Sequence, residues 1–221
     1  MTDILAESVE SLLELGNDGS DPVVESMESY ASERNFPIVG PSVGRFLRVA
    51  ATMVEAERVF EFGSGFGYSA VWTAAALPDD GEIFLTDYDE ENLDRARKFL
   101  DRAGYGRQAR YRAGDAMTAF AETSGQFDLV LVDHEKARYA AAFEQVADRV
   151  RDGGIVVADN MMDGPVDPED VESALAGADP VDERTAGIVS YIERVRDDPD
   201  FESVLVPLGQ GIAVSVRRQS Q

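Results

Sequence analysis

A glycine-dense stretch at residues 61–69, which reads EFGSGFGYS, constrains the fold of this chain more than any other segment. Its glycines permit positive φ angles and a close approach of the backbone to a ligand. The stretch follows an apolar run at 58–62 of buried-strand type and precedes an alanine-rich helical pattern at 68–77. A strand, a glycine loop and a helix form the opening unit of a doubly wound α/β sheet, so we expect this loop to bind a cofactor.

Length and composition favour a single domain and exclude several kinds of chemistry. With 221 residues, the chain is long enough to bury most of its apolar surface without metals or cross-links. It has no cysteine, which rules out disulfides, thiolate catalysis and a thiolate zinc site. No stretch of about 18 apolar residues and no secretory signal pattern is present, so we expect no membrane partner and a cytoplasmic location.

The charge balance is strongly acidic. The chain carries 20 basic and 43 acidic residues, a formal net charge of −23, and its only lysines are Lys98 and Lys136. The acids are spread over the whole sequence, which suggests an adaptation of the entire surface. Such a surface repels itself at low ionic strength, whereas molar salt reduces the screening length to about 3 Å. We therefore expect the protein of an extreme halophile.

The first 54 residues predict a helical cap ahead of a Rossmann-like core at 55–221. Helical patterns span 2–15, 22–34 and 42–54, and two prolines interrupt the pattern between the second and third helices. Beyond the core's first five predicted strands and their helices, the end of the chain predicts a helix at 186–196 and two further strands at 201–207 and 211–216.

Two acids follow the second and third predicted strands. The strand at 82–87 ends in Asp87, where a carboxylate can accept hydrogen bonds from the hydroxyls of a ribose. The alternative for such an acid is helix capping, but Asp89 fits that role better. The strand at 108–112 leads to Asp115, which can cap the helix at 116–122 while also contacting a cofactor.

Three oxygen ligands follow the next two predicted strands. Asp133 ends the apolar strand 127–133, and Asp159 and Asn160 follow the strand 153–158. Parallel strands bring their carboxyl ends to one edge of the sheet, where this architecture places its active site. Two carboxylates and an amide oxygen suit a hard cation such as Mg²⁺, whereas zinc would favour histidine or cysteine. Any one of these acids alone would more simply cap a helix.

Lys136 is the candidate general base, because one helical turn beyond Asp133 would bring its amine to the same metal. A nearby divalent cation disfavours a second positive charge on that amine and assists loss of a substrate hydroxyl proton. A solvated surface lysine is the alternative. His134 is the only histidine, and we expect its side chain to point away from the metal.

The glycine loop, the pattern D-H-x-K-x-R-Y at 133–139 and the triplet A-D-N at 158–160 together resemble the class I S-adenosylmethionine-dependent, cation-dependent O-methyltransferases of the catechol and caffeoyl-CoA type. The resemblance covers about residues 36–217. It implies an α/β fold with a seven-stranded, mostly parallel sheet in the order 3-2-1-4-5-7-6, closed by an antiparallel hairpin. It also implies that the loop near Val39 covers the methyl donor, and that a homodimer forms.

The resemblance assigns roles to individual residues. It places Asp115 opposite the adenine amino group and His134 near the cofactor. The residues expected to bind S-adenosylmethionine are Val39, Glu61, Gly63, Gly65, Gly67, Ser69, Asp87, Asp115, Ala116, Asp133 and His134. Asp133, Asp159 and Asn160 would hold a divalent cation, Mg²⁺ by preference, and Lys136 would be catalytic. The expected reaction is in-line attack of an acceptor oxygen on the methyl group, with vicinal hydroxyls as the best chelating acceptor.

The sequence departs from the catechol enzymes on the acceptor side. Glu135 stands where they carry a tryptophan beside the adenine, and Val204 stands where they present an acid, although Glu202 is nearby. The stretch 163–182 lies where the family varies its substrate lid. These differences leave the small-molecule acceptor unidentified.

Two other catalytic functions stay open, as does a non-catalytic binding domain, which would leave Lys136 and the three proposed metal ligands without a purpose. One is a methyltransferase of the same family that acts on a hydroxylated tRNA base, which a continuous arginine face would support; Arg107, Arg110 and Arg112 are clustered, but acids surround them. Nucleic acid is therefore not favoured as a partner. The other is a nicotinamide-dependent oxidoreductase, which would leave Lys136 and the three proposed metal ligands without a shared purpose.

Overall fold

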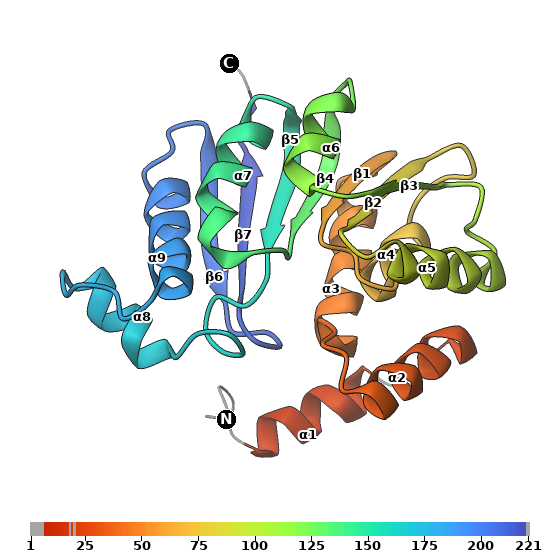
Figure 1. The fold of residues 1–221 in the computed structure, drawn as a ribbon, viewed down its shortest axis with the longest axis horizontal. Coiled ribbons are helices and arrows are strands. Elements are labelled where there is room, and N and C mark those ends of the chain that lie inside the picture. The colour runs from red at the N-terminus through yellow and green to blue at the C-terminus, as the bar shows by residue number, and fades with distance from the viewer. Residues whose placement is uncertain (1–6, 18, 20, 220–221) are drawn as a thin grey trace.

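The computed structural model describes residues 7–17, 19 and 21–219 (Figure 1). The strands are β1 (Arg58–Phe62), β2 (Glu82–Asp87), β3 (Ala109–Ala113), β4 (Phe127–Val132), β5 (Val150–Ala158), β6 (Phe201–Val206) and β7 (Ile212–Arg217). The helices are α1 (Glu7–Gly16), α2 (Pro22–Arg34), α3 (Gly40–Met53), α4 (Tyr68–Ala74), α5 (Glu90–Ala103), α6 (Ala116–Glu122), the 3₁₀ helix η1 (Lys136–Arg138), α7 (Tyr139–Ala147), α8 (Pro168–Leu175) and α9 (Glu183–Arg196).

The seven strands form one sheet in the order β3-β2-β1-β4-β5-β7-β6. β1 to β5 pair in parallel, and β7 pairs antiparallel with both β5 and β6. The expected strand order and the closing antiparallel hairpin are therefore confirmed. Because β1 to β5 run in the same direction, the loops that carry the predicted site residues all leave the same edge of the sheet.

Helices cover both faces of the parallel part of the sheet (Figure 1). Residues of α2 to α5 form one buried apolar cluster with the sheet, and residues of α6 to α9 form a second cluster on the opposite face. The central strand β4 is buried at every position, as its uninterrupted apolar sequence predicts for a parallel strand with helices on both sides.

The helical cap is attached directly to the glycine loop. The Tyr68 hydroxyl donates to Glu28 of α2 over 2.7 Å. The Phe66 ring packs against Tyr30 and Phe36, each with a centroid separation of 5.0 Å. α3 shares an apolar cluster with β1, so the cap and the Rossmann-like core on either side of residue 54 pack as one core. The division of the chain at that residue stays a prediction.

Some element ends differ from the predictions. α3 begins at Gly40 instead of 42, α4 ends at Ala74 instead of 77, and α9 begins at Glu183 because Asp182 caps it through the Thr185 amide. Of the helix predicted at 2–15, the part before Glu7 lies outside the described residues. The expected lid stretch contains α8. Within the described ranges, no helix is both long and apolar enough to cross a membrane.

Candidate active site

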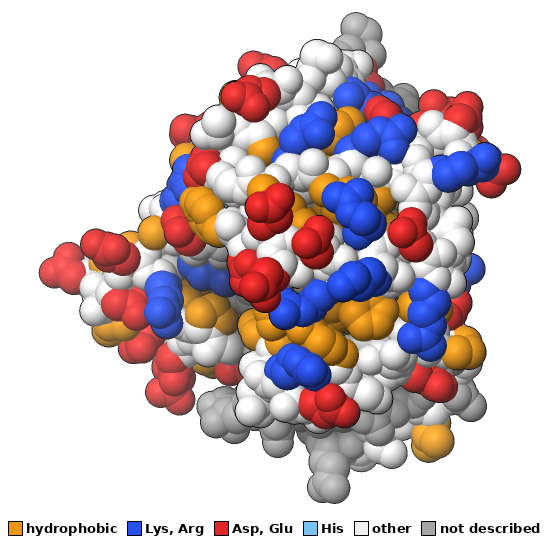
Figure 2. All heavy atoms as spheres, turned by 45° about the vertical axis from the view of Figure 1, so that its right-hand side comes forward, with side chains coloured by type: hydrophobic (Ala, Val, Ile, Leu, Met, Phe, Trp, Pro, Cys, Tyr) orange, Lys and Arg blue, Asp and Glu red, His pale blue; other side chains and the backbone are white. Residues whose placement is uncertain are grey.

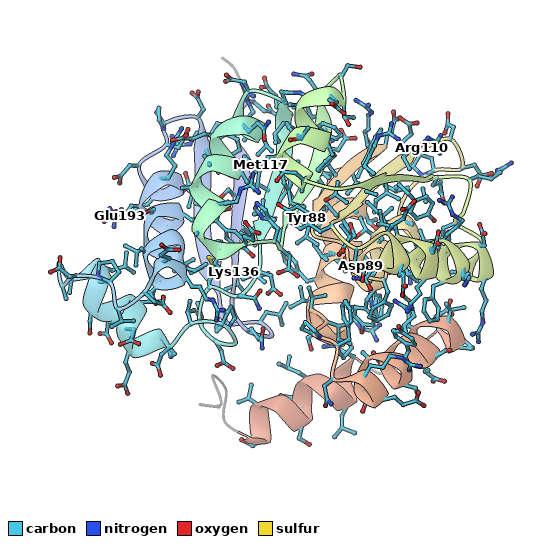
Figure 3. The ribbon with its side chains drawn as sticks, viewed as in Figure 1. Tyr88, Asp89, Arg110, Met117, Lys136 and Glu193 are labelled. Carbon is cyan, nitrogen blue, oxygen red and sulfur yellow. The ribbon has the colours of Figure 1, made fainter. Side chains whose placement is uncertain are left out.

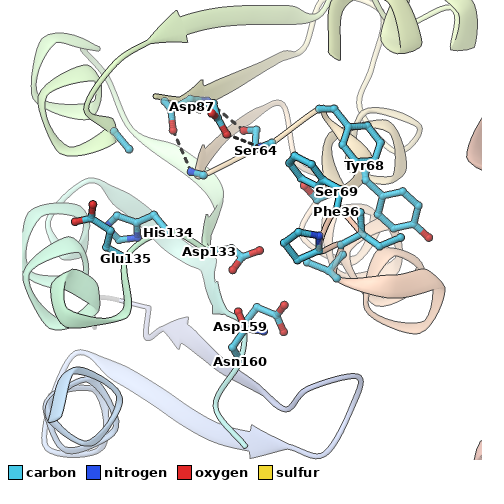
Figure 4. Close-up of a pocket in the computed structure, with 18 of the residues that line it drawn as sticks. Phe36, Ser64, Tyr68, Ser69, Asp87, Asp133, His134, Glu135, Asp159 and Asn160 are labelled. Carbon is cyan, nitrogen blue, oxygen red and sulfur yellow. Dashed lines mark hydrogen bonds between the residues drawn. The ribbon is translucent and has the colours of Figure 1, made fainter. Parts of the chain in front are cut away.

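A pocket of about 540 Å³ opens at the carboxyl edge of the sheet (Figure 4). This volume lies within the usual range for small-molecule sites. Its lining comes from the cap loop, the glycine loop and the segments after β2, β3, β4 and β5. The predicted residues among the lining are Val39, Gly63, Gly65, Ser69, Asp87, Ala116, Asp133, His134, Lys136, Asp159 and Asn160. The fold therefore brings together most of the side chains that the sequence singled out.

The glycines of the loop have different neighbours. Gly63 has φ of 82°, and a Cβ there would lie 2.2 Å from the Asp133 carbonyl oxygen, so the loop lies against the end of β4. The Gly65 amide donates to the Asp87 carboxylate over 3.0 Å. Gly67 does not line the pocket; a Cβ there would lie 2.9 Å from Ala96 of α5. A glycine is required at position 67 because α5 packs closely against it. The predicted contact of Gly67 with the cofactor stays a prediction.

Asp115 is fully occupied by protein donors. Its Oδ1 accepts from the Thr118 amide at 2.8 Å and from the Thr118 hydroxyl at 2.9 Å. Its Oδ2 accepts from the Tyr88 hydroxyl at 2.8 Å and from Arg138. The Arg138 guanidinium, together with the Thr118 and Tyr88 donors, holds the pKa of Asp115 well below its usual range. The predicted contact of this carboxylate with adenine therefore stays untested, and here it acts as cap and ion-pair partner.

Glu61 lies beneath the glycine loop with no exposed surface. Burial raises the pKa of Glu61 to about 8, although Ser64 and Ser69 oppose the shift. This buried, largely neutral carboxyl group lies below the loop and does not line the pocket. Any contact of Glu61 with the cofactor stays a prediction.

His134 lines the pocket on the side away from the Asp133 carboxylate, as Figure 4 shows. Its ring stacks on Tyr139 at a centroid separation of 5.5 Å. Burial, followed by the charges of Arg138 and Lys136, lowers the pKa of His134 to about 4. Both ring nitrogens are buried, and neither has a hydrogen-bond partner among the described residues.

The Lys136 amine lies where the spacing predicted it. It donates to Asp133 Oδ1 at 2.9 Å and to the Tyr139 hydroxyl at 2.5 Å. Its side chain is only 10% exposed, so it is not a solvated surface lysine. The short helix η1 turns the amine back toward the end of β4, which brings a candidate base beside a candidate metal ligand.

Asp159 and Asn160 complete the proposed metal set. Asp159 is 2% exposed, and no hydrogen-bond donor in the described part of the chain reaches its Oδ1. Burial, and then the nearby Asp133 charge, raise the pKa of Asp159 to about 7. Asn160 has φ of 62° and donates its amide nitrogen to Gln210 Oε1, which leaves its amide oxygen as the ligating atom.

These residues fit a hard divalent cation. Burial and the Asp133 charge raise the pKa of Asp159, whose Oδ1 also has no partner, so a bound cation would stabilise this site. No three His, Cys, Asp or Glu side chains within the described ranges are grouped closely enough to hold a metal by themselves. The proposed site therefore depends on the Asn160 amide as its third protein ligand.

The lining and supporting residues that sequence reasoning missed include Phe36, Tyr88, Tyr139 and Gln210. Tyr139 is the last residue of the D-H-x-K-x-R-Y pattern, and its position three residues after Lys136 could have predicted their contact. Gln210 belongs to the β6–β7 turn, which is 50 residues away from Asn160. Nothing in the local sequence indicated that contact.

The acceptor side of the pocket differs from the expectation based on the catechol enzymes. Val204 is 57% exposed and does not line the pocket, and Glu202 pairs with Arg218 on the surface. Gly164, Pro165 and Gln210 line this side instead. Glu135 does line the pocket, next to His134.

Comparisons with known proteins identify the family. A family model described as O-methyltransferase matches residues 22–218. A catechol O-methyltransferase from Niastella koreensis is 36% identical over 146 residues, which span 63% of this chain and 66% of that protein. A caffeoyl-CoA O-methyltransferase from Petroselinum crispum is 30% identical over 192 residues, 79% of this chain and 74% of that protein.

Solved structures share the fold. The O-methyltransferase TomG from Streptomyces achromogenes, solved in complex with SAM, has a TM-score of 0.82 at 22% identity, with 99% of this chain and 100% of that chain covered. An O-methyltransferase from Bacillus cereus in complex with SAH also has a TM-score of 0.82 at 22% identity, with 96% and 97% covered. With the family model, the glycine loop and the acids at the strand ends, these findings show that the chain belongs to the O-methyltransferase family, a family of S-adenosylmethionine-dependent enzymes.

Proposed function

We propose that this protein transfers a methyl group from S-adenosylmethionine to a hydroxyl group of a small, catechol-like acceptor. The observation that carries the proposal is the position of the Lys136 amine, 2.9 Å from Asp133 and inside the same pocket as the glycine loop. Family membership supports methyl transfer over the nicotinamide-dependent alternative, which gives no joint role to Lys136 and the acids beside it.

Asp133, Asp159 and Asn160 would hold a divalent cation, and Mg²⁺ is the ion that best suits their oxygens. When bound, the cation would chelate two neighbouring acceptor oxygens and favour loss of a proton from one of them. The pKa of Asp159, raised by burial and by Asp133, supports this assignment because a cation would relieve that repulsion.

The side chains of this chain supply the remaining requirements. Lys136 would accept the acceptor's proton as the oxygen–carbon bond forms and the carbon–sulfur bond of the methyl donor breaks. Tyr139, whose hydroxyl accepts from Lys136 at 2.5 Å, fixes the direction of the amine. The cap residues Phe36 and Ile38 line the pocket opposite β4 and exclude water from it.

The test is methyl transfer to catechol by the purified protein with S-adenosylmethionine and Mg²⁺, followed by mass spectrometry of the product. We expect an O-methylated catechol and loss of activity after treatment with a chelator. Activity that survives complete metal removal would reject the metal assignment. No transfer to catechol, but transfer to unmodified cellular RNA, would support the tRNA alternative.

The surface gives that alternative little support. Figure 2 shows basic side chains interspersed with acidic ones on the face that it presents. Arg110 pairs with Glu82 at 3.0 Å, so one member of the arginine cluster is already neutralised locally. A phosphate backbone is best held by a continuous basic surface.

We further propose that the acidic surface is an adaptation to high salt. A net charge of −23 on 221 residues creates self-repulsion that concentrated salt would screen. We expect the protein to unfold on dialysis from molar salt to about 10 mM salt, as followed by circular dichroism. A native spectrum with unchanged thermal stability at low salt would contradict this proposal.

A further inference from the structure

Three side chains from separate strand ends meet at the mouth of the pocket. Tyr88 follows β2, Asp115 follows β3, and Arg138 ends η1 after β4. Arg138 donates to both the Tyr88 hydroxyl, at 2.9 Å, and to Asp115, and Tyr88 itself donates to Asp115 at 2.8 Å. We call this closed triangle of hydrogen bonds the clasp.

The clasp leaves Asp115 without capacity for a further donor. A carboxylate offers about four lone-pair positions, and Thr118, Tyr88 and Arg138 supply four donated hydrogen bonds between them. An adenine amino group could hydrogen-bond to Asp115 only by displacing one of these donors. In this arrangement the carboxylate holds protein side chains in place.

The part of the clasp that faces the pocket is the Tyr88 side chain. Tyr88 lines the pocket and is 59% exposed, although its hydroxyl is held by two partners. It comes directly after Asp87, at the strand end where this architecture binds a ribose. An aromatic ring held at that point can pack against the flat face of a nucleobase.

The same short helix carries Lys136 at one end and Arg138 at the other. η1 is fixed independently of the clasp, because Gly187 of α9 packs so closely that a Cβ there would lie 2.2 Å from the Lys136 carbonyl oxygen. Lys136 has its own partners in Asp133 and Tyr139. Figure 3 shows Tyr88 and Lys136 at separate places on this side of the sheet. Loss of the clasp should therefore affect the cofactor end more than the amine.

We propose that Arg138 is a positioning residue for the methyl donor: through Asp115 and the Tyr88 hydroxyl it holds the Tyr88 ring as a preformed wall against the adenine. This inference rests on the proposed function and identifies the side chains that shape its nucleoside end. An exposed tyrosine otherwise loses rotational freedom when a ligand packs on it, and the clasp fixes the ring before the ligand arrives.

The test is calorimetric binding of S-adenosylhomocysteine to the wild type, Arg138→Gln, Tyr88→Phe and the double variant. Tyr88→Phe keeps the ring and removes only the hydroxyl that the clasp holds. We expect each single change to weaken S-adenosylhomocysteine binding about fivefold relative to the wild type. The double variant should lose no more than about tenfold, because both changes break the same triangle. Arg138→Lys, which keeps one charged donor, should recover part of the affinity.

Arg194→Gln is the matched control. Arg194 lies on α9, pairs with Asp198 beyond the end of that helix, does not line the pocket, and is 35% exposed compared with 33% for Arg138. It should leave binding within twofold of the wild type. In turnover assays with catechol, the loss in Arg138→Gln should appear mainly in the KM for S-adenosylmethionine and less in kcat.

Unchanged S-adenosylhomocysteine affinity in both Arg138→Gln and Tyr88→Phe would overturn the inference, whatever their thermal stability. Independent, multiplicative losses in the double variant would also overturn it. If Arg138→Gln does not fold, the S-adenosylhomocysteine affinity of Tyr88→Phe alone tests the inference. A wild type that binds S-adenosylhomocysteine but does not methylate catechol contradicts the proposed acceptor and leaves the clasp to be decided by these variants.

Discussion

Asp115 and Asp159 occupy equivalent places after two strands of one sheet, yet their surroundings shift their pKa values in opposite directions. At the cofactor end, Arg138 and other donors satisfy Asp115 and hold its pKa well below the usual range. At the catalytic end, Asp159 is buried beside Asp133, and its pKa is raised to about 7. The hydrogen bonds of the Asp115 carboxylate are complete without a ligand. The charge of the Asp159 carboxylate is one that the protein alone does not balance.

The difference separates two ways of building a binding site. The cofactor end is arranged by hydrogen bonds among protein groups before any ligand is present. The end that we propose as catalytic concentrates negative charge, which would cost stability in the metal-free protein and would be offset by the proposed cation. Four substitutions, in order of expected effect, test this contrast.

Lys136→Ala should have the largest effect. Removing the proposed base should lower kcat by about 10²–10⁴-fold, while S-adenosylhomocysteine affinity stays within about twofold, because the amine faces Asp133 and not the nucleoside end. Steady-state kinetics and calorimetry measure the two quantities. Lys98→Ala, which removes the other lysine from an exposed position on α5, is the control. Full turnover in Lys136→Ala would remove this residue as the base.

Gly63→Ala should disturb both ends together, because Gly63 is where the glycine loop lies against β4. Its Cβ would meet the Asp133 carbonyl at 2.2 Å in addition to the cost of φ at 82°. We expect a loss of about 3 kcal/mol or more in the free energy of unfolding. Gly104→Ala has a similar φ of 89° but open space around it, so it should cost only about 1 kcal/mol. Equal losses in denaturant melts would show that the loop tolerates the clash.

Asp159→Asn should stabilise the metal-free protein. Because the folded pKa of Asp159 is raised, the unfolded carboxyl ionises first as pH rises, and wild-type stability falls between about pH 4 and pH 7. In chelator at pH 8, the variant should gain about 2 kcal/mol in the free energy of unfolding. Mg²⁺ should then raise the melting temperature of the wild type and not that of the variant. A variant less stable than wild type under chelator contradicts the electrostatic account.

Asp115→Asn should have the opposite sign and the smallest size. Asparagine keeps a helix cap for the Thr118 amide but removes the charge that pairs with Arg138. The pair is partly exposed, so we expect a loss of about 1 kcal/mol at pH 7. Chemical denaturation at neutral pH measures it. A gain in stability would show that the charge of Asp115, like that of Asp159, destabilises the folded protein.

Local sequence patterns predicted the elements that local forces determine. The glycine loop, the apolar strand β4 and the acids at the strand ends could be placed from residues near them. Lys136 could be placed near Asp133 because only three residues separate them, although the connecting residues are not helical and η1 begins at Lys136 itself. The strand order came from the family resemblance, since no periodicity encodes it.

The missed features depend on contacts between distant segments. Arg138 and Asp115 are 23 residues apart, and Asn160 and Gln210 are 50 apart. The packing of α5 against Gly67 also joins distant parts of the chain, and the predicted cofactor contact of Gly67 stays a prediction. Spacing rules apply within one helix or strand, so these partners become visible only when the sheet is assembled.

The contact between Gln210 and Asn160 also has a consequence for how a newly made chain becomes active. Asn160 follows β5, but its amide is oriented by a residue of the β6–β7 turn. β7 lies between β5 and β6 in the sheet, so this turn reaches Asn160 only when the last strands have left the ribosome and docked against β5. A nascent chain with every glycine and acid of the site already synthesised therefore lacks the complete site until its final strand is in place.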